Sequence, residues 1–222
     1  MRPLSFRCRQ LLLIQLLISF PALLAAQTWE AVIAGGRCPA GTPWQFWIHR
    51  GRLDRVLFYL EGGGACWTPG TCDLKGRATF DPSVDEQDNP ANADGILKLD
   101  QPANPFRGWS VVFVPYCTAD VHLGTRTVTY EPGITIDHRG AANVRDALAW
   151  VKKQLPGLTR IVVAGGSAGA IPTPVYAARL AGMYPTAAVT GIGDGAGGYR
   201  SPAIAGILVR WGVKDGLADL PA

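Results

Sequence analysis

Histidine is scarce in this sequence, and neither histidine nor cysteine is arranged to bind a metal. The 222 residues include three histidines, His49, His122 and His138, which do not form a cluster. There is no Cys-x-x-Cys pair either, and clustered histidines and Cys-x-x-Cys pairs are the usual signatures of zinc sites. The sequence therefore predicts neither a metal nor another cofactor.

The first 26 residues have the layout of a secretory signal peptide. Three arginines, Arg2, Arg7 and Arg9, precede an apolar stretch from residue 11 to residue 24, and the small pair Ala25-Ala26 follows. We expect cleavage after Ala26 and export to the periplasm or the extracellular space. Leu24, two positions before Ala26, is larger than the small residue usual at that position, so an uncleaved anchor is the alternative.

We expect residues 27 to 222 to form one α/β domain. This part of the chain carries no excess charge of either sign. Without the predicted signal peptide, 18 basic and 17 acidic side chains remain, a formal charge of +1. This near-neutral balance gives no indication of nucleic-acid binding. We expect a monomer with no membrane span after cleavage.

The cysteine count predicts two disulfides. Of five cysteines, Cys8 lies in the predicted signal peptide, and an even number remains in an exported chain. Cys66 and Cys72 are separated by five residues that include a Pro-Gly pair, so a small local loop can close between them. Cys38 is then left to pair with Cys117.

Short apolar segments, read as strands, alternate along the chain with glycine-rich turns and with segments of helical periodicity. This order of elements predicts a mostly parallel sheet with helices on both faces. Residues 67 to 108 are rich in Pro, Asn, Asp and Gly, and we expect a surface excursion without regular elements there. The expected strands are 44–49, 56–60, 111–116, 160–164 and 187–192, and the expected helices are 139–155 and a segment ending near Gly182.

A Gly-x-Ser-x-Gly motif centred on Ser167 follows one of these strands directly and indicates a nucleophile elbow. Such a turn holds its serine in a strained backbone conformation. Glycines two residues before and two after it are needed, because a Cβ there would collide with the neighbouring strand and helix. The alternative interpretation is an ordinary tight turn between a strand and a helix.

A second glycine-rich loop, Gly62-Gly63-Gly64, follows an earlier strand and could supply backbone N–H groups to an oxyanion. In serine hydrolases of the α/β type one donor also comes from the residue after the serine, here Ala168. The alternatives are a flexible turn and a phosphate-binding loop. The Gly-Lys-Ser/Thr of a Walker loop is absent, and no Gly-x-Gly-x-x-Gly opens directly into a helix.

Several blocks, in this order over residues 29 to about 200, resemble the pectin acetylesterase and Notum-type carboxylesterase family. They are Leu60 to Trp67 with Thr71-Cys72, Asn104-Pro105 with Trp109, Val114 to Gly124, His138-Arg139-Gly140 with Asn143, and Gly166-Ser167-Ala168-Gly169. The resemblance implies an α/β-hydrolase fold, hydrolysis of acetyl or other acyl esters, and the same two disulfides. It also implies Ser167 as nucleophile, Gly63, Gly64 and Ala168 as oxyanion donors, and a small acyl ester or an acetylated glycan as substrate.

The sequence departs from the family pattern at two points. All three histidines precede Ser167, whereas α/β-hydrolases take their acid and then their base from positions after the serine. The family's acid and histidine lie well downstream, so we expect that this sequence lacks the C-terminal part of the domain; a complete protein with a rearranged triad is the alternative. Pro172 and Pro174 predict that the helix after the serine begins late or bends.

Two further residues are candidates for lining the site. His122 follows a predicted strand end, although a histidine next to Asp120 is more often a structural hydrogen-bonding residue. Asp194 ends the strand after the nucleophile helix, where this fold can hold its acid, and otherwise shapes the loop. We interpret His49 as structural and His138 as a capping or packing residue. The leading hypothesis is an exported serine esterase, and the rival is a non-catalytic remnant that binds acyl or glycan ligands.

Overall fold

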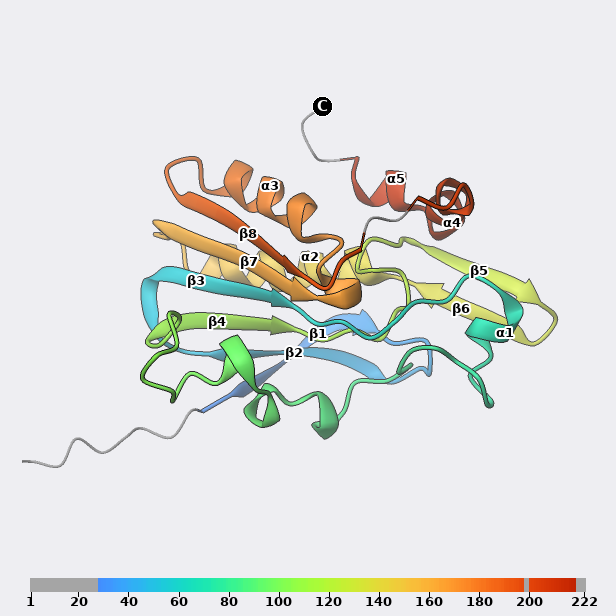
Figure 1. Cartoon of the computed structure of the whole chain (residues 1–222), viewed down its shortest axis with the longest axis horizontal. Coiled ribbons are helices and arrows are strands. Elements are labelled where there is room, and N and C mark those ends of the chain that lie inside the picture. The colour runs from blue at the N-terminus through green and yellow to red at the C-terminus, as the bar shows by residue number, and fades with distance from the viewer. Residues whose placement is uncertain (1–27, 198–199, 219–222) are drawn as a thin grey trace, which may run out of the picture.

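A computed structural model of the protein describes residues 28–197 and 200–218, and a six-stranded sheet lies at its centre (Figure 1). The predicted signal peptide lies outside the described residues. The sheet order is β1-β2-β4-β3-β7-β8, and β5 and β6 form a separate hairpin. The strands are β1 (Glu30–Arg37), β2 (Pro43–His49), β3 (Arg52–Leu60), β4 (Trp109–Val114), β5 (Arg126–Glu131), β6 (Ile134–His138), β7 (Arg160–Gly166) and β8 (Ala188–Asp194). The helices are α1 (Pro69–Cys72), α2 (Gly140–Gln154), α3 (Thr173–Met183), α4 (Ala203–Trp211) and α5 (Val213–Gly216).

The sheet is mostly parallel, as the alternation of elements predicts. Strands β4, β3, β7 and β8 pair in parallel, and β1 and β2 extend the sheet in antiparallel fashion. The second half of the central strand β3 is apolar: Val56, Leu57, Phe58 and Leu60 are all fully buried. Burial on both faces explains why this strand is a continuous apolar run rather than an alternating one.

Helices α2 and α3 lie together on one face of the sheet. The Tyr184 hydroxyl, at the C-terminal end of α3, donates to the carbonyl oxygens of Val151 and Leu155 at the end of α2. The ring of Trp150 on α2 meets Phe46 of β2 edge-on, with 6.0 Å between ring centroids. This face therefore carries the helices expected at 139–155 and before Gly182.

The opposite face is covered by the excursion between β3 and β4. Tyr59 and Phe113 stack there with centroids 5.7 Å apart, and Phe113 also meets Trp47. Leu97 and Phe106 of the excursion are buried in the same core. A cavity of about 320 Å³ remains between the sheet and residues 87 to 97, with Tyr59 and Phe113 in its wall.

The excursion contains more local order than its composition predicts. Besides α1 it has three short 3₁₀ turns, at residues 86–88, 90–92 and 95–97. Asp85 and Asn89 cap the first two by accepting backbone N–H groups, and the Asn104 amide donates to the carbonyls of Ile96 and Lys98. These turns depend on side-chain caps rather than on apolar periodicity, so the prediction of no regular element was wrong at these points.

Both predicted disulfides are confirmed. Cys38 bonds to Cys117 with 5.5 Å between Cα atoms, and Cys66 bonds to Cys72 with 5.1 Å. Both separations lie within the range that a disulfide can bridge. The first bond ties the end of β1 to the segment that follows β4, and the second closes the loop that contains α1. Such bonds fit a protein of an oxidising compartment.

The two disulfides should differ in their contribution to stability. Cys38–Cys117 closes a loop of 79 residues and Cys66–Cys72 one of 6. On loop-closure entropy alone, the double variant C38A/C117A should lose about 4 to 5 kcal/mol of unfolding free energy, and C66A/C72A about 2 kcal/mol. Urea unfolding monitored by tryptophan fluorescence measures both. An equal or smaller loss for C38A/C117A would contradict the entropic explanation.

Within residues 28–197 and 200–218, no helix is long and apolar enough to span a membrane.

Candidate active site

Ser167 lies at a sharp turn directly after β7. Its φ is +49°, in the left-handed region that a residue other than glycine rarely adopts, and a 3₁₀ turn, Ser167–Gly169, follows at once. The serine is exposed, whereas Ala168 and Gly169 behind it are buried. An exposed serine held in strained backbone between a strand and a helix has the geometry of a nucleophile elbow.

The glycines on either side of Ser167 are required by sterics, as the motif predicts. A Cβ on Gly165 would lie 2.2 Å from the carbonyl oxygen of Gly169. A Cβ on Gly169 would lie 2.1 Å from the carbonyl oxygen of Leu60, at the end of the neighbouring strand β3. No larger residue fits at either position, because both distances are far shorter than a van der Waals contact.

The helix after the serine begins late, in agreement with the prediction from its prolines. Helix α3 starts only at Thr173, with Pro172 at the preceding cap position and Pro174 in the first turn. Proline is tolerated there because its missing N–H group would have no partner within the helix.

The glycine loop Gly62–Gly64 lies against the serine. A Cβ on Gly62 would be 3.1 Å from the Cβ of Ser167 and 2.5 Å from the carbonyl oxygen of Gly166. Gly63 has φ +151° and Gly64 has φ +81°, conformations that L side chains rarely adopt. The structure thus brings together the two motifs that the sequence contains more than 100 residues apart.

His122 supports the start of the glycine loop. Its Nε2 lies 2.8 Å from the carbonyl oxygen of Glu61, and its ring is 4.6 Å from that of Tyr116. Burial lowers the pKa of His122 to about 4, which keeps the imidazole neutral at neutral pH. Because a carbonyl only accepts, Nε2 carries the hydrogen and donates it to Glu61.

Both ends of the glycine loop are attached to one strained segment, residues 116 to 124. The N–H of Tyr116 donates to the Glu61 carboxyl group at 3.0 Å, and the N–H of Cys66 donates to the Ala119 carbonyl at 3.1 Å. Ala119, Val121 and His122 all have positive φ, of 57°, 50° and 60°. Strain concentrated in three non-glycine residues persists only where the surroundings over-determine it.

Asp120 holds this strained segment in place. Its buried carboxyl group accepts hydrogen bonds from the Thr118 hydroxyl and from the backbone N–H groups of His122, Gly124 and Gly140. Gly140 is the first residue of α2, so Asp120 also serves that helix as an N-terminal cap supplied from a distant loop. Sequence reasoning missed this role, although Asp120 and His122 stand in a block that it singled out.

Glu61 is neutral at neutral pH, because burial raises its pKa to about 8. A raised pKa means that the group contributes stability below about pH 4.5, and that this contribution is lost as the pH rises towards 8. The isosteric variant Glu61→Gln cannot ionise and still accepts from Tyr116. The melting temperature of Glu61→Gln minus that of the wild type should therefore increase as the pH rises from 4.5 to 8. Above pH 8 this difference should stay constant.

Thermal unfolding across this pH series tests the expectation, with the exposed Glu131→Gln as the control. If the difference between Glu61→Gln and wild type stays constant with pH, the Glu61 carboxyl group is not protonated in the native protein.

Asp194 lies at the end of β8, directly opposite Gly166 in the strand pairing. The next residue, Gly195, comes close to the serine, since a Cβ there would lie 3.8 Å from the Ser167 nitrogen. Asp194 is exposed, and it lies at the same carboxyl end of the parallel strands as the elbow. The structure thus brings this candidate acid near Ser167.

The other two histidines are engaged elsewhere. His138 is buried, with Nδ1 2.8 Å from the Thr118 carbonyl and Nε2 2.8 Å from the Tyr130 hydroxyl. His49 contacts the carbonyl of Thr28 at 2.9 Å, at the far end of β2. In the part of the chain that the structure describes, no hydrogen bond joins the Ser167 hydroxyl to a histidine or a carboxylate, and no three metal-binding side chains converge.

The sequence profile described as pectinacetylesterase matches residues 26–200. The chain belongs to the pectinacetylesterase family. This family membership agrees with the α/β-hydrolase type of sheet. Members of this family and the related Notum proteins are carboxylesterases, so the chain is of a class that hydrolyses acyl esters.

Several curated relatives are Notum proteins. The chain is 34% identical over 110 residues to the inactive palmitoleoyl-protein carboxylesterase notum1b of Danio rerio, a match that covers 48% of this chain and 76% of that protein. It is 27% identical over 168 residues to the palmitoleoyl-protein carboxylesterase notum1' of Xenopus laevis, covering 71% of this chain and 34% of the relative. The chain thus spans about a third of the length of the Xenopus protein.

Proposed function

We propose that the protein is an exported serine carboxylesterase in which Ser167 attacks an acyl ester. The observation that carries this proposal is the contact between the strained Ser167 elbow and the glycine loop at Gly62. An oxyanion must be met by donors at about 2.7 to 3.1 Å. We assign this role to the backbone N–H groups of Gly63, Gly64 and Ala168. No metal or other cofactor is needed for this chemistry.

The proposed substrate is a small acyl ester or an acetylated glycan. Supporting this choice, the cavity beside β3 combines the stacked rings of Tyr59 and Phe113 with the amides of Gln87, Asn89 and Asn92. Aromatic faces and planar amides suit the apolar face and the hydroxyl groups of a sugar ring. Asp194, which pairs with Gly166 at the end of β8, is the candidate acid.

The second candidate function is a non-catalytic binding protein that keeps the pocket without turnover. Two observations favour it: no described base contacts Ser167, and the relative from Danio rerio is named an inactive carboxylesterase. Under this alternative the glycine loop would still bind an acyl or glycan ligand.

Covalent labelling tests the nucleophile. With free imidazole added as an external base, a fluorophosphonate should form an adduct on Ser167 in preference to the other serines, because the glycine loop stabilises the developing negative charge there. Peptide mass spectrometry locates the adduct, and Ser167→Ala is the control. An adduct spread over several serines, or one of the same yield in Ser167→Ala, would exclude Ser167 as a selected nucleophile.

His122 should act as a positioning residue of the oxyanion site. The variant His122→Leu removes the hydrogen bond to Glu61 and should slow fluorophosphonate labelling of Ser167 about tenfold. Tyr184→Phe is the control, since it also removes buried hydrogen bonds to backbone carbonyls, here those of Val151 and Leu155 on the helical face of the sheet. Both variants should lower the melting temperature, and only His122→Leu should slow labelling. Equal labelling rates in the two variants would show that the His122 contact is merely structural.

A further inference from the structure

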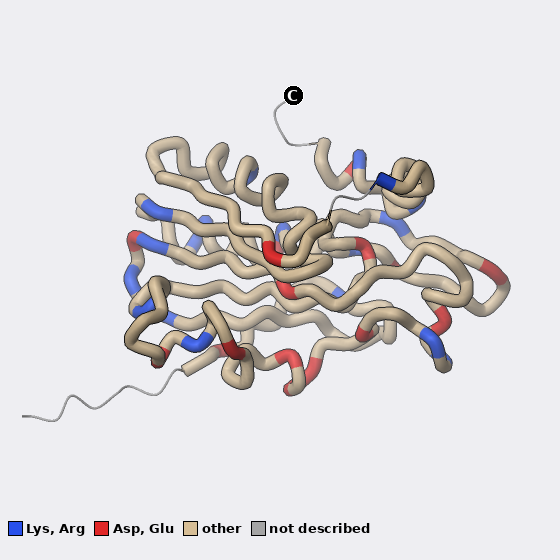
Figure 2. The backbone as a smooth tube through the Cα atoms, in the orientation of Figure 1, with Lys and Arg blue, Asp and Glu red and all other residues tan. Residues whose placement is uncertain are grey.

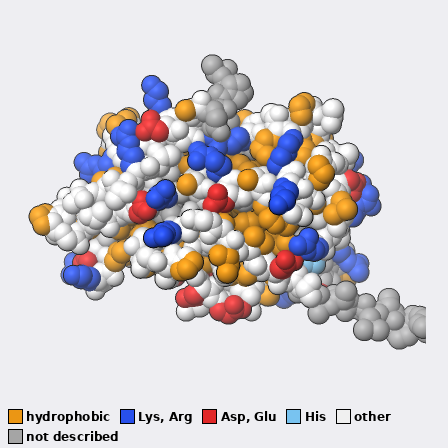
Figure 3. Space-filling view, turned by 180° about the vertical axis from the view of Figure 1, so that it is seen from behind, with side chains coloured by type: hydrophobic (Ala, Val, Ile, Leu, Met, Phe, Trp, Pro, Cys, Tyr) orange, Lys and Arg blue, Asp and Glu red, His pale blue; other side chains and the backbone are white. Residues whose placement is uncertain are grey.

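The cavity beside β3 has carboxyl groups in its wall and no basic side chain. Glu61, Asp88 and Asp94 line it, and among the residues that the structure describes no Lys, Arg or His does. Lys98 bonds to Asp94 at 3.4 Å but does not line the cavity. Figure 2 shows several Asp and Glu positions along the excursion that closes this cavity, and Figure 3 shows acidic side chains along the same lower border from behind. The cavity therefore offers negative charge without a counter-ion in its wall.

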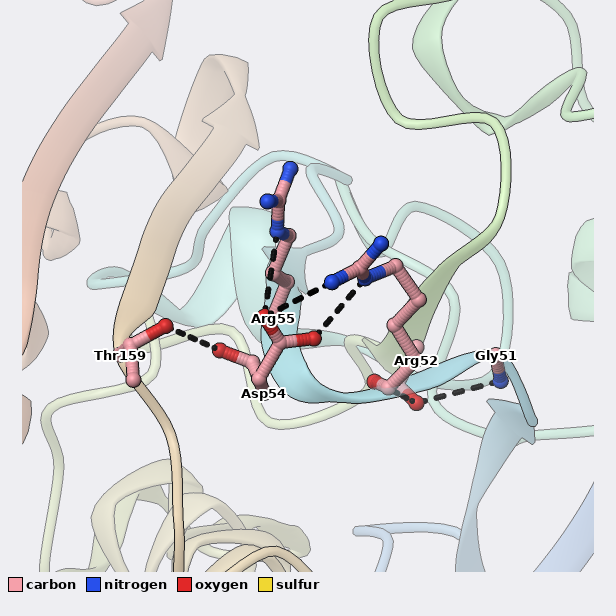
Figure 4. A network of polar contacts seen from close by, with 6 residues as sticks. Gly51, Arg52, Asp54, Arg55 and Thr159 are labelled. Carbon is pink, nitrogen blue, oxygen red and sulfur yellow. Dashed lines mark hydrogen bonds and ion pairs between the residues drawn. The ribbon is translucent and has the colours of Figure 1, made fainter.

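A carboxylate at the opposite end of the same strand is neutralised by arginines (Figure 4). Asp54 accepts two hydrogen bonds from Arg52, at 2.9 and 3.2 Å, and one from Arg55 at 3.4 Å. The hydrogen bond from Arg52 lowers the pKa of Asp54 to about 2. In the cavity, by contrast, burial raises the pKa of Asp88, and the charges of neighbouring carboxylates add to that rise. A cation bound in the cavity would relieve this repulsion.

Aromatic rings and side-chain amides complete the wall of the cavity. The rings of Tyr59 and Phe113 both border it, and the amides of Gln87 and Asn92 lie in the same wall. An ammonium group is attracted to carboxylates and to the faces of aromatic rings, and amides form hydrogen bonds with hydroxyl groups. A sugar ring that carries a free amine would therefore match all three kinds of group.

The cavity reaches both loops of the candidate active site. Glu61 directly precedes the glycine loop, and a Cβ on Gly166 would lie 3.3 Å from the Tyr59 hydroxyl. Burial raises the pKa of Tyr59, and the charges of Glu61 and Asp194 add to this rise, so the tyrosine hydroxyl is within range of both carboxyl groups. The alcohol part of an ester whose carbonyl meets Ser167 can therefore occupy this cavity.

We propose that the cavity binds the positively charged amine of an amino sugar, and that the substrate is an acylated glycan with free amino groups. In naming a substrate, this inference rests on the proposed esterase function. The amine would contact Asp88 and Glu61, and the sugar hydroxyl groups would contact the amides of Gln87 and Asn92. An anionic sugar fits poorly, because its carboxylate would meet carboxyl groups with no cation beside them.

Binding of short oligosaccharides to the Ser167→Ala variant tests the proposal without any need for turnover. In isothermal titration calorimetry just below neutral pH, a glucosamine trimer should bind at least about tenfold more tightly than an N-acetylglucosamine trimer or a galacturonate trimer. Asp88→Asn should weaken binding of the glucosamine trimer about tenfold, while its amide oxygen can still accept from the Asp85 N–H. Asp100→Asn is the matched control, since it removes the same charge from an exposed residue of the excursion that does not line the cavity.

Tight binding of the glucosamine trimer that Asp88→Asn weakens and Asp100→Asn leaves unchanged supports the proposal. Equal affinity for the glucosamine and N-acetylglucosamine trimers would overturn it, and so would equal weakening in the two variants. If Asp88→Asn melts earlier than the wild type, Asp94→Asn replaces it in the same comparison, because the Asp94 side chain is exposed.

Competition separates this proposal from the esterase function itself. With imidazole present, a saturating concentration of the glucosamine trimer should slow fluorophosphonate labelling of Ser167 at least about tenfold, because the occupied cavity adjoins the elbow. Binding of the trimer without any change in the labelling rate would overturn the assignment of the cavity to the substrate. A protein that binds the trimer but is not labelled at Ser167 at all would refute the nucleophile alone and would still support the amine site.

Discussion

The 222-residue chain should hydrolyse p-nitrophenyl acetate at a rate close to that of its Ser167→Ala variant. Its three histidines are all described, and two of them, His122 and His138, are buried and bonded to backbone carbonyls. A serine without a general base loses about four to six orders of magnitude in turnover, while stabilisation by an oxyanion site can remain. Steady-state release of p-nitrophenol, compared between the two proteins, measures this.

Chemical rescue with free imidazole also tests whether Ser167 lacks a general base. Free imidazole should raise turnover by the wild type above that by Ser167→Ala, because it can supply the missing base beside the exposed serine. Extending the chain with the C-terminal part of a family member should raise turnover much further, and Ser167→Ala should abolish that gain.

Substantial Ser167-dependent turnover without imidazole would contradict the absence of a base. Asp194 and His122 would then be the first residues to test as a rearranged acid and base. If His122→Ala and Asp194→Ala left the activity unchanged, a rearranged triad built from these two residues would be excluded as well.

Gly169→Ala should be the most damaging single substitution for the fold around the elbow. The new Cβ would meet two backbone carbonyls of the neighbouring loop, those of Leu60 at 2.1 Å and Glu61 at 2.5 Å. Neither carbonyl can withdraw cheaply, because β3 is the buried central strand, so we expect a loss of about 3 kcal/mol or more.

Gly182→Ala provides the matched control for this substitution. Gly182 lies in α3, and a Cβ there would meet nothing within 4 Å. Because alanine favours a helix over glycine, this variant should be unchanged or slightly more stable. Urea unfolding of both variants measures the difference. A Gly169→Ala protein as stable as Gly182→Ala would mean that the elbow backbone is free to shift.

The parts of the fold that sequence could predict are those governed by short-range rules. The continuous apolar run at Val56–Leu60 predicts a buried strand, and the spacing of Val144, Leu148 and Val151 predicts α2. The steric requirement for glycine around Ser167 follows from the turn alone. The hairpin of β5 and β6 was not predicted, although alternating β-branched residues around Pro132-Gly133 carry its usual signal.

The support of the site could not be predicted, because it depends on contacts between distant residues. Nothing local to His122 indicates that its ring reaches the Glu61 carbonyl, 61 positions earlier in the chain. Asp120 likewise caps a helix that begins 20 residues later, whereas capping rules look only at the residues adjoining a helix. Strand β1 was also missed, since its exposed and half-buried residues lack a clear apolar pattern.

The contacts that tie the glycine loop to residues 116 to 124 join residues that precede the nucleophile, and Trp211 and Tyr176 of the described part add hydrogen bonds to the Cys66 and His122 carbonyls. The shape of this loop therefore does not depend on the acid and base that complete a triad. A lineage of this fold can lose its proton-transfer residues and still keep a preformed cradle for an anion. Such a protein would bind tetrahedral or carboxylate groups at the place where a catalytic relative stabilises a transition state.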